Sequence, residues 1–182
     1  DGTPGGRDRL KLGMQVEVES AEVGDDGTGR KAKASHVRFG SAVLGPVEGA
    51  PDVAGGRLTV LGQAVTVTAA TVFGQAGGLG ALQAGDVVEV HALYDAAAAA
   101  YKASRIERRA GAGVDAYRLR GPVADLGART FRIGGATIDY VNRSPVVEPG
   151  ALADGRTVRV RLATTPSGAG VWDALSVRGG EA

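Results

Sequence analysis

The stretch LKLGMQVEV at residues 10–18 decides the fold, because its pattern returns at 82–90 as LQAGDVVEV and at 152–160 as LADGRTVRV. Each copy reads Leu-x-x-Gly-x-x-Val-x-Val. Apolar residues alternate with polar ones after the glycine, and a period of two is typical of a strand with one buried face. The glycine of each copy is expected to take positive φ in a turn that leads into the strand. These glycines are Gly13, Gly85 and Gly155.

The repeat extends beyond this pattern, since the tripeptide Gly-Pro-Val occurs at 45–47 and again at 121–123. One complete unit is expected to contain strands at 41–49, 57–62, 64–73, 86–94 and 100–109, with a helical turn near 79–83. The next unit is expected to contain strands at 116–125, 129–134, 136–142, 156–165 and 170–179, with a turn near 149–153. Five strands with a helix between the third and the fourth is the element order of the OB barrel. A small β-sandwich is the alternative.

The sequence therefore predicts an all-β protein of tandem, small, five-stranded OB-like barrels, the first of which is incomplete. Residues 41–110 form the second repeat and residues 111–182 the third. Residues 1–40 hold only the last two strands of the first repeat. A two-stranded hairpin is barely stable by itself, so this half repeat is expected to pack on its neighbour or to pair with another chain.

Composition narrows the class of function. The 182 residues carry 21 Lys and Arg against 20 Asp and Glu, and this balance argues against binding nucleic acid, for which a basic excess supplies most of the affinity. The absence of cysteine excludes disulfides and thiolate chemistry. No apolar run is long enough to cross a bilayer, and no signal segment begins the chain.

With the repeat laid out, the chain resembles the bacterial DUF5666 family, a domain of unknown function. The resemblance is carried by LKLGMQVEVES, VLGPVEG, RLTVLGQAVTVTAATVF, LQAGDVVEVHALYD, YKASRIE and YRLRGPVADL. It implies an exported or envelope-associated protein, outside the cytoplasm, built of barrel-like modules and often anchored by an upstream lipid. The motifs are structural, and the resemblance supplies no catalytic residues.

No constellation of catalytic or metal-binding residues is visible, and neither a cofactor nor an enzymatic activity is expected. His36 and His91 are expected to lie on the surface, the latter at an outward position of its strand. The stretch EVGDDGTGRK at 22–31 lacks the alternating acidic ligands of a calcium loop and is expected to be the hairpin turn. The run DAAAAAY at 95–101 is likewise expected to be a loop between strands.

Four aromatic residues near strand ends and loops could stack a sugar or a base, although packing at the barrel rim is the simpler interpretation. These are Tyr94, Tyr101, Tyr117 and Trp172.

Charged residues at outward strand positions suggest assembly faces. Glu17 and Glu19 form an acidic row in the first unit, whereas the third unit offers basic residues. The basic residues are Arg118, Arg120, Arg159 and Arg161. Complementary ends would favour head-to-tail contact, although ordinary solvated strand faces remain the simpler interpretation.

The hypothesis favoured by the sequence is a non-enzymatic envelope or extracellular binding or scaffold protein, whose partner is itself, another envelope protein or a glycan. A subunit that assembles through open strand edges, and an OB-type binder of oligosaccharide or single-stranded nucleic acid, are the alternatives.

Overall fold

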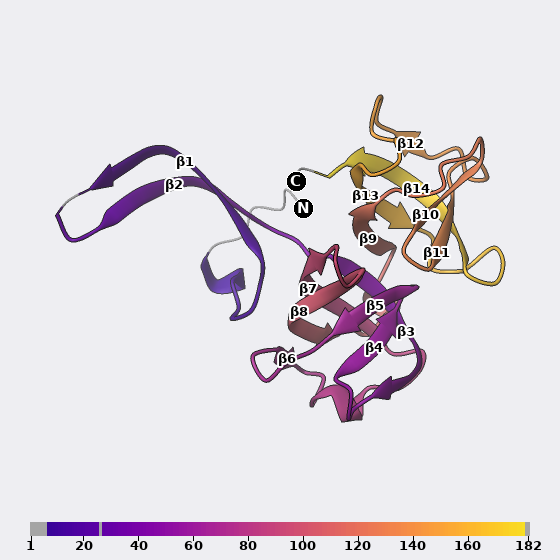
Figure 1. Cartoon of the computed structure of the whole chain (residues 1–182), viewed down its shortest axis with the longest axis horizontal. Helices are drawn as coiled ribbons and strands as arrows, with labels where there is room; N and C mark the ends of the chain where they lie inside the picture. Colours follow the sequence, from indigo (N-terminus) through magenta and orange to yellow (C-terminus); the bar gives the residue numbers. More distant parts are fainter. Residues whose placement is uncertain (1–6, 26, 181–182) are drawn as a thin grey trace.

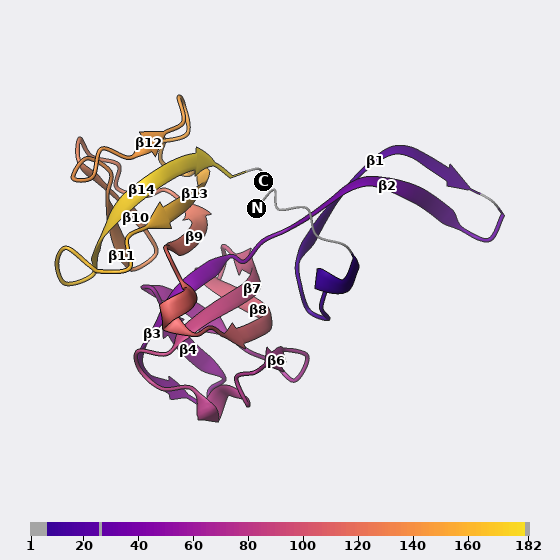
Figure 2. The same cartoon turned by 180° about the vertical axis from the view of Figure 1, so that it is seen from behind.

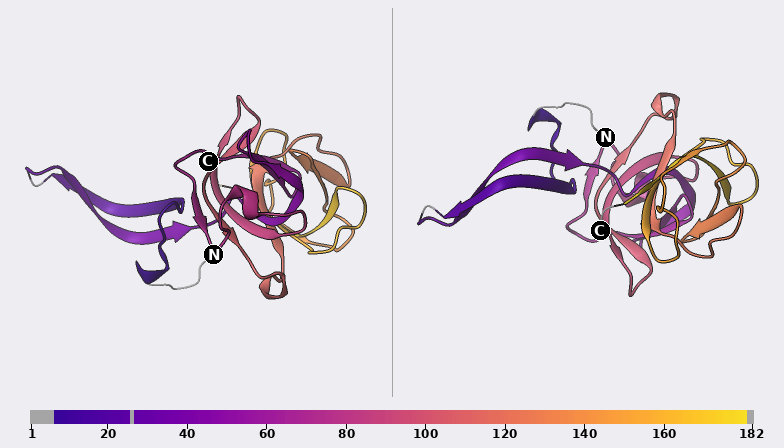
Figure 3. Two further views of the ribbon diagram at one scale, coloured as in Figure 1. Left: turned by 90° about the horizontal axis from the view of Figure 1, so that it is seen from below. Right: turned by 90° about the horizontal axis from the view of Figure 1, so that it is seen from above.

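The computed structural model describes residues 7–25 and 27–180, which form a projecting hairpin followed by two β-barrels (Figure 1). The hairpin consists of β1 (Val16–Asp25) and β2 (Arg30–Phe39), preceded by the 3₁₀ turn η1 (Arg7–Arg9). Its two strands make a sheet of their own. The views from behind, below and above all show this hairpin extending away from the barrels (Figures 2 and 3).

The first barrel closes in the strand order of an OB fold. Its strands are β3 (Val43–Asp52), β4 (Arg57–Val60), β5 (Gln63–Thr66), β6 (Val72–Gly74), β7 (Val87–Asp95) and β8 (Ala100–Arg108), with η2 (Leu79–Ala81) before β7. The ring runs β3-β4-β5-β8-β7 and returns to β3. Strands β5 and β8 are parallel and the other pairs in the ring are antiparallel.

The second barrel repeats this plan. Its elements are η3 (Gly111–Gly113), β9 (Tyr117–Pro122), β10 (Thr130–Ile133), β11 (Ala136–Asp139), β12 (Val146–Val147), β13 (Thr157–Leu162) and β14 (Val171–Gly179). Strand β9 pairs with β13, and β11 lies parallel to β14. A single bridge between Ala124 and Arg132 closes the ring beside β10. Tandem OB-like barrels are therefore confirmed, and the sandwich alternative is wrong.

The turn chemistry predicted from the repeat is also confirmed. Gly13, Gly85 and Gly155 have φ of +85°, +89° and +82°, a region that only glycine adopts without strain. In the run at 95–101 the chain turns at residues 96–99 between β7 and β8, as expected, and the carboxylate of Asp95 accepts a hydrogen bond from the backbone of Ala97.

One local prediction was wrong. The stretch 64–73 is two strands, β5 and β6, because the chain turns at residues 69–70 before pairing again with β8. The stretch 149–153 contains the predicted turn, in which Ala151 donates a hydrogen bond to the carbonyl of Glu148, although this turn is not helical. The helices in the described ranges are single 3₁₀ turns, and none of them has the length or apolarity to span a membrane.

The two barrels are joined through equivalent elements. Strands β3 and β9 are the first strands of their repeats, and they pair antiparallel with Val43 opposite Leu119. The Gly-Pro-Val alignment makes these two residues equivalent. The turn after β4 meets the turn after β10, where Gly135 donates a hydrogen bond of 2.8 Å to the carbonyl of Gly62. Gln63 is buried at this junction and donates to the carbonyl of Ile133.

Candidate functional site

The hairpin has the same construction as the last two strands of each complete repeat. Val18 pairs with Val37 in the hairpin, Val90 with Ile106 in the first barrel, and Val160 with Val177 in the second. In all three cases the register shifts directly after the next outward residue of the leading strand. A shared register and a shared bulge position identify the hairpin as the closing half of a further repeat.

The apolar face of the hairpin is uncovered. Val16, Val18 and Val37 are 47%, 54% and 42% exposed. The equivalent residues of the complete repeats are at most 2% exposed; they are Val88, Val90, Ile106, Val158, Val160 and Val177. Large apolar side chains of this kind are normally removed from water, so the hairpin presents a barrel-interior surface without a barrel.

Both long edges of the hairpin are also unpaired within the described residues. The corresponding edge of β7 is covered by β3, and that of β13 by β9. The corresponding edges of β8 and β14 take parallel strands. Exposed edges of this type recruit further strands.

The opposite face of the hairpin is polar and locally neutralised. Glu17 lies directly across from Arg38, and the carboxylate of Glu19 pairs with Arg38 and lies 3.6 Å from His36. The two acidic residues predicted as an assembly row therefore have basic neighbours within their own sheet. His36 is exposed, as predicted.

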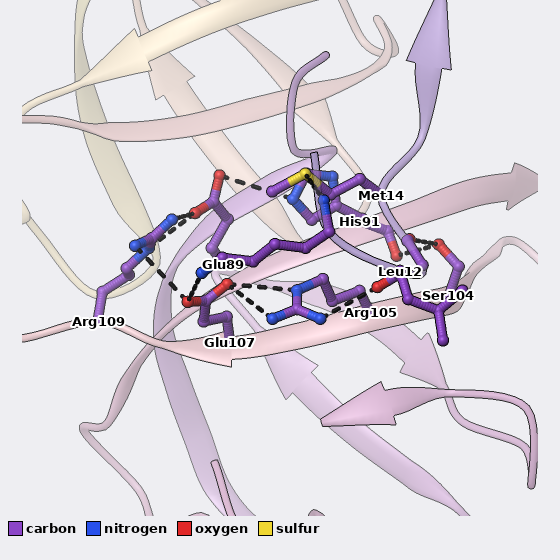
Figure 4. Close-up of polar contacts among 10 residues, drawn as sticks. Leu12, Met14, Glu89, His91, Ser104, Arg105, Glu107 and Arg109 are labelled. Atoms are coloured by element: carbon purple, nitrogen blue, oxygen red, sulfur yellow. Dashed lines mark hydrogen bonds and ion pairs between the residues drawn. The ribbon is translucent and has the colours of Figure 1, made fainter. Parts of the chain in front are cut away.

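A short loop fastens the base of the hairpin to the first barrel (Figure 4). The side chain of Ser104 donates to the carbonyl of Gly13 at 2.7 Å, and Arg105 donates to the carbonyl of Leu12 at 3.0 Å. Lys11 forms an ion pair of 2.9 Å with Glu107. We call residues 11–15 the latch, because these contacts hold the loop against β8.

Beneath the latch lies a compact network of charged side chains. Arg105 and Glu107 are 7% and 3% exposed and pair at 3.2 Å. Arg109 bridges Glu107 and Glu89. Burial acts to raise the pKa of Glu107, but Lys11, Arg109 and Arg105 together outweigh it and lower that pKa. The carboxylate is therefore held ionised to complete the network.

His91 was wrongly predicted to lie on the surface. It does point outward from its strand, but the latch covers it and leaves it 1% exposed. Burial lowers its pKa; Glu89, at 3.9 Å, opposes this shift, and Arg105 adds to it. The sequence predicted the turn at Gly13, but not the contact of that turn with Ser104 of β8, because the two residues are far apart in the chain.

The basic residues predicted on the third repeat do come together. Arg118 lies opposite Arg161, and Arg120 opposite Arg159, on strands β9 and β13. Arg161 also pairs with Asp115 at 3.0 Å. These residues share a sheet with each other but not with Glu17 and Glu19, which lie on the separate hairpin sheet.

The four predicted aromatic residues form two pairs rather than one platform. Tyr94 contacts Tyr101, and Tyr117 contacts Trp172, with ring centroids 5.1 and 5.5 Å apart. Tyr101 and Trp172 are 2% and 7% exposed, and their rings pack in the hydrophobic core. The hydroxyl of Tyr101 donates to the carbonyl of Arg120, across the junction between the barrels.

A small hollow of about 270 Å³ lies where β2 meets the linker before β9. Its lining includes Phe39, Leu44, Glu89, Arg109 and Arg118. Among the residues that the structure describes, no three His, Asp or Glu side chains gather as a metal site would require. Asp26, one of the two acidic residues considered at the hairpin turn, lies outside the described residues.

Comparison with known proteins identifies the family of these repeats. A family described as a domain of unknown function, DUF5666, matches residues 45–107 and 120–178, more than half of the chain. The chain belongs to the DUF5666 family. The two matched segments fall within the two complete barrels, and the hairpin precedes both of them. No curated protein and no solved structure matches the chain.

Proposed function

We propose that this DUF5666 protein is a non-enzymatic binding and scaffold module of the bacterial envelope or exterior, which joins polypeptides through its open hairpin. One observation carries the proposal: side chains that are buried in both complete repeats are about half exposed in the hairpin. The family resemblance supports the location.

The physical basis is the burial of apolar surface together with strand pairing. Fully burying one valine side chain stabilises a protein by about 1.5–3 kcal/mol relative to leaving it exposed. Three valines of the hairpin, Val16, Val18 and Val37, are exposed and would contribute in this way when a partner covers them. The unpaired backbone groups along both edges add hydrogen bonds and set the register of whatever strand arrives. The two barrels that carry this surface are joined to each other by the pairing of β3 with β9.

The alternative of a self-assembling subunit follows from the same surface, since open strand edges can join identical chains into oligomers or filaments. The alternative of an OB-type ligand binder has less support. OB folds bind oligomers over strands two and three, and in both barrels the turn that joins those strands packs against its counterpart.

The test is the mass of the intact chain across a dilution series, measured by light scattering. The free chain is expected to associate through its uncovered face as concentration rises. A double variant, Val16→Ser with Val18→Ser, should weaken this association. The matched control is Glu17→Ser with Glu19→Ser, which changes the same strand on its polar face and should leave association unchanged.

A chain that remains monomeric at every concentration, or one whose association responds equally to both double variants, would contradict an association role for the hairpin face. Electron microscopy of the concentrated sample then separates closed oligomers from filaments.

A further inference from the structure

The apolar face of the hairpin is uncovered, and the two complete barrels show which strands cover the equivalent face. In the first barrel it is the meander β3-β4-β5, extended by β6, and in the second it is β9-β10-β11, extended by β12. We propose that the hairpin is completed by a three-stranded β-meander of the same repeat pattern, whose outer strands pair with the two edges of the hairpin. This inference rests on the proposed function, because it names the partner of the same surface.

The register on the β1 edge specifies the first strand of this partner. Val43 of β3 lies opposite Val90, and Gly45 lies opposite Val88. In the second barrel Leu119 and Gly121 of β9 occupy the same places opposite Val160 and Val158. The partner is therefore expected to carry apolar-x-Gly-Pro, antiparallel to β1, with the apolar residue opposite Val18 and the glycine opposite Val16.

The β2 edge specifies a parallel strand. Phe73 of β6 lies opposite Ile106, and Val147 of β12 lies opposite Val177. Val37 holds the equivalent position in β2, so the partner is expected to place an apolar residue beside it. The core of the completed repeat would also cover Leu10, which is 42% exposed, whereas its equivalent Leu82 is 3% exposed.

A second copy of the described chain does not fit this role. Its two meanders are already closed by their own hairpins, β7-β8 and β13-β14. Donating one would leave a buried valine pair such as Val88 and Val90 exposed in place of Val16 and Val18, with no net gain in burial.

The experiment fuses a copy of residues 41–81 to Leu10, in place of residues 1–9 of the chain. Because Leu10 is the equivalent of Leu82, the junction reproduces the natural one. Hydrogen exchange is followed by mass spectrometry over β1 and β2, and mass is measured across the dilution series. Exchange in the hairpin should slow to the rates of β7 and β8, and the fused chain should remain monomeric.

Two variants of the fused chain serve as controls. A copy with the sequence of residues 41–81 shuffled should give no protection of the hairpin. Val16→Ser with Val18→Ser should remove the protection gained, while the exchange of β7, β8, β13 and β14 stays unchanged. Both controls keep the two natural barrels intact.

The outcomes separate this inference from the function on which it rests. A fused chain that still associates through the valine face, with unchanged hairpin exchange, would overturn the meander as partner but keep the hairpin as an association surface. Hairpin protection equal for the natural and the shuffled copy would also overturn it. If neither chain associates and the valine variants change nothing, the proposed function itself fails.

Discussion

Replacing Gly13 by alanine should release the latch without weakening the barrels. Three equivalent glycines share nearly the same positive φ, and a residue with a side chain there is strained by about 1–2 kcal/mol. At Gly85 and Gly155 an added Cβ would meet nothing within 4 Å. At Gly13 it would lie 2.6 Å from the carbonyl oxygen of Ser104 and 3.1 Å from Cβ of Arg105.

The clash can be converted into a displacement. Restoring an ordinary contact of 3.4 Å requires the loop to move by about 0.8 Å. The hydrogen bonds that hold the latch are 2.7 Å at Gly13 and 3.0 Å at Leu12, and a shift of this size stretches them to or beyond the useful range. The latch should therefore open, whereas the barrels, which do not depend on it for closure, should keep their stability.

Two measurements test this reasoning. Gly85→Ala and Gly155→Ala should each lower the melting temperature by about 2–8 °C, the shift that corresponds to their φ strain in a protein of this size. Gly13→Ala should leave the melting of the barrels unchanged and speed hydrogen exchange across residues 11–15. Unchanged exchange in the latch, or a loss of barrel stability as large as that of Gly85→Ala, would refute the argument.

Two further predictions concern the buried histidine and the barrel junction. The pKa of His91 lies below its ordinary value of 6.5, so the unfolded chain takes up more protons than the folded chain just below that pH. The contribution of His91 to stability should then be full above pH 6.5 and should decline as pH falls toward the folded-state pKa. Melting curves between about pH 8 and about pH 5 should show this decline, and His91→Leu should flatten it. A decline that persists in His91→Leu would show that another group is responsible. Gly121→Ala would place a Cβ 2.5 Å from both Ile133 Cγ2 and the hydroxyl of Tyr101, and such overpacking should cost about 1–3 kcal/mol in urea unfolding. Gly127→Ala, whose Cβ would lie 3.5 Å from its nearest neighbour, is the control, and equal losses in the two variants would argue against close packing at the junction.

The sequence predicted those parts of the molecule that depend on local pattern. The strands could be predicted from the alternating valines, and the turn before each strand could be predicted from the repeated glycine. Both depend on backbone geometry within a few residues. The incomplete first repeat followed from the same pattern, since residues 10–39 match the closing hairpins of the other units.

The remaining features depend on contacts between residues far apart in the chain. The burial of His91 requires the latch, whose ion pair joins Lys11 to Glu107, and no local pattern indicates that pairing. The role of Tyr101 depends on a carbonyl in the other barrel. For the same reason, the division of a predicted single strand into β5 and β6 could not be read from residues 64–73.

The pairing of β3 with β9 limits how repeats of this kind can be strung together. Contact between equivalent residues, such as Val43 with Leu119, places a local two-fold axis between the barrels. In such a contact each barrel uses the same strand, so that strand is no longer free to pair with a third barrel. A longer array cannot add barrels by repeating that junction, so it must grow as successive pairs. Within a pair the barrels share hydrogen-bonded strands, whereas the half repeat before the pair is held by side chains that contact a single loop. Bending of such an array should therefore concentrate at every second junction.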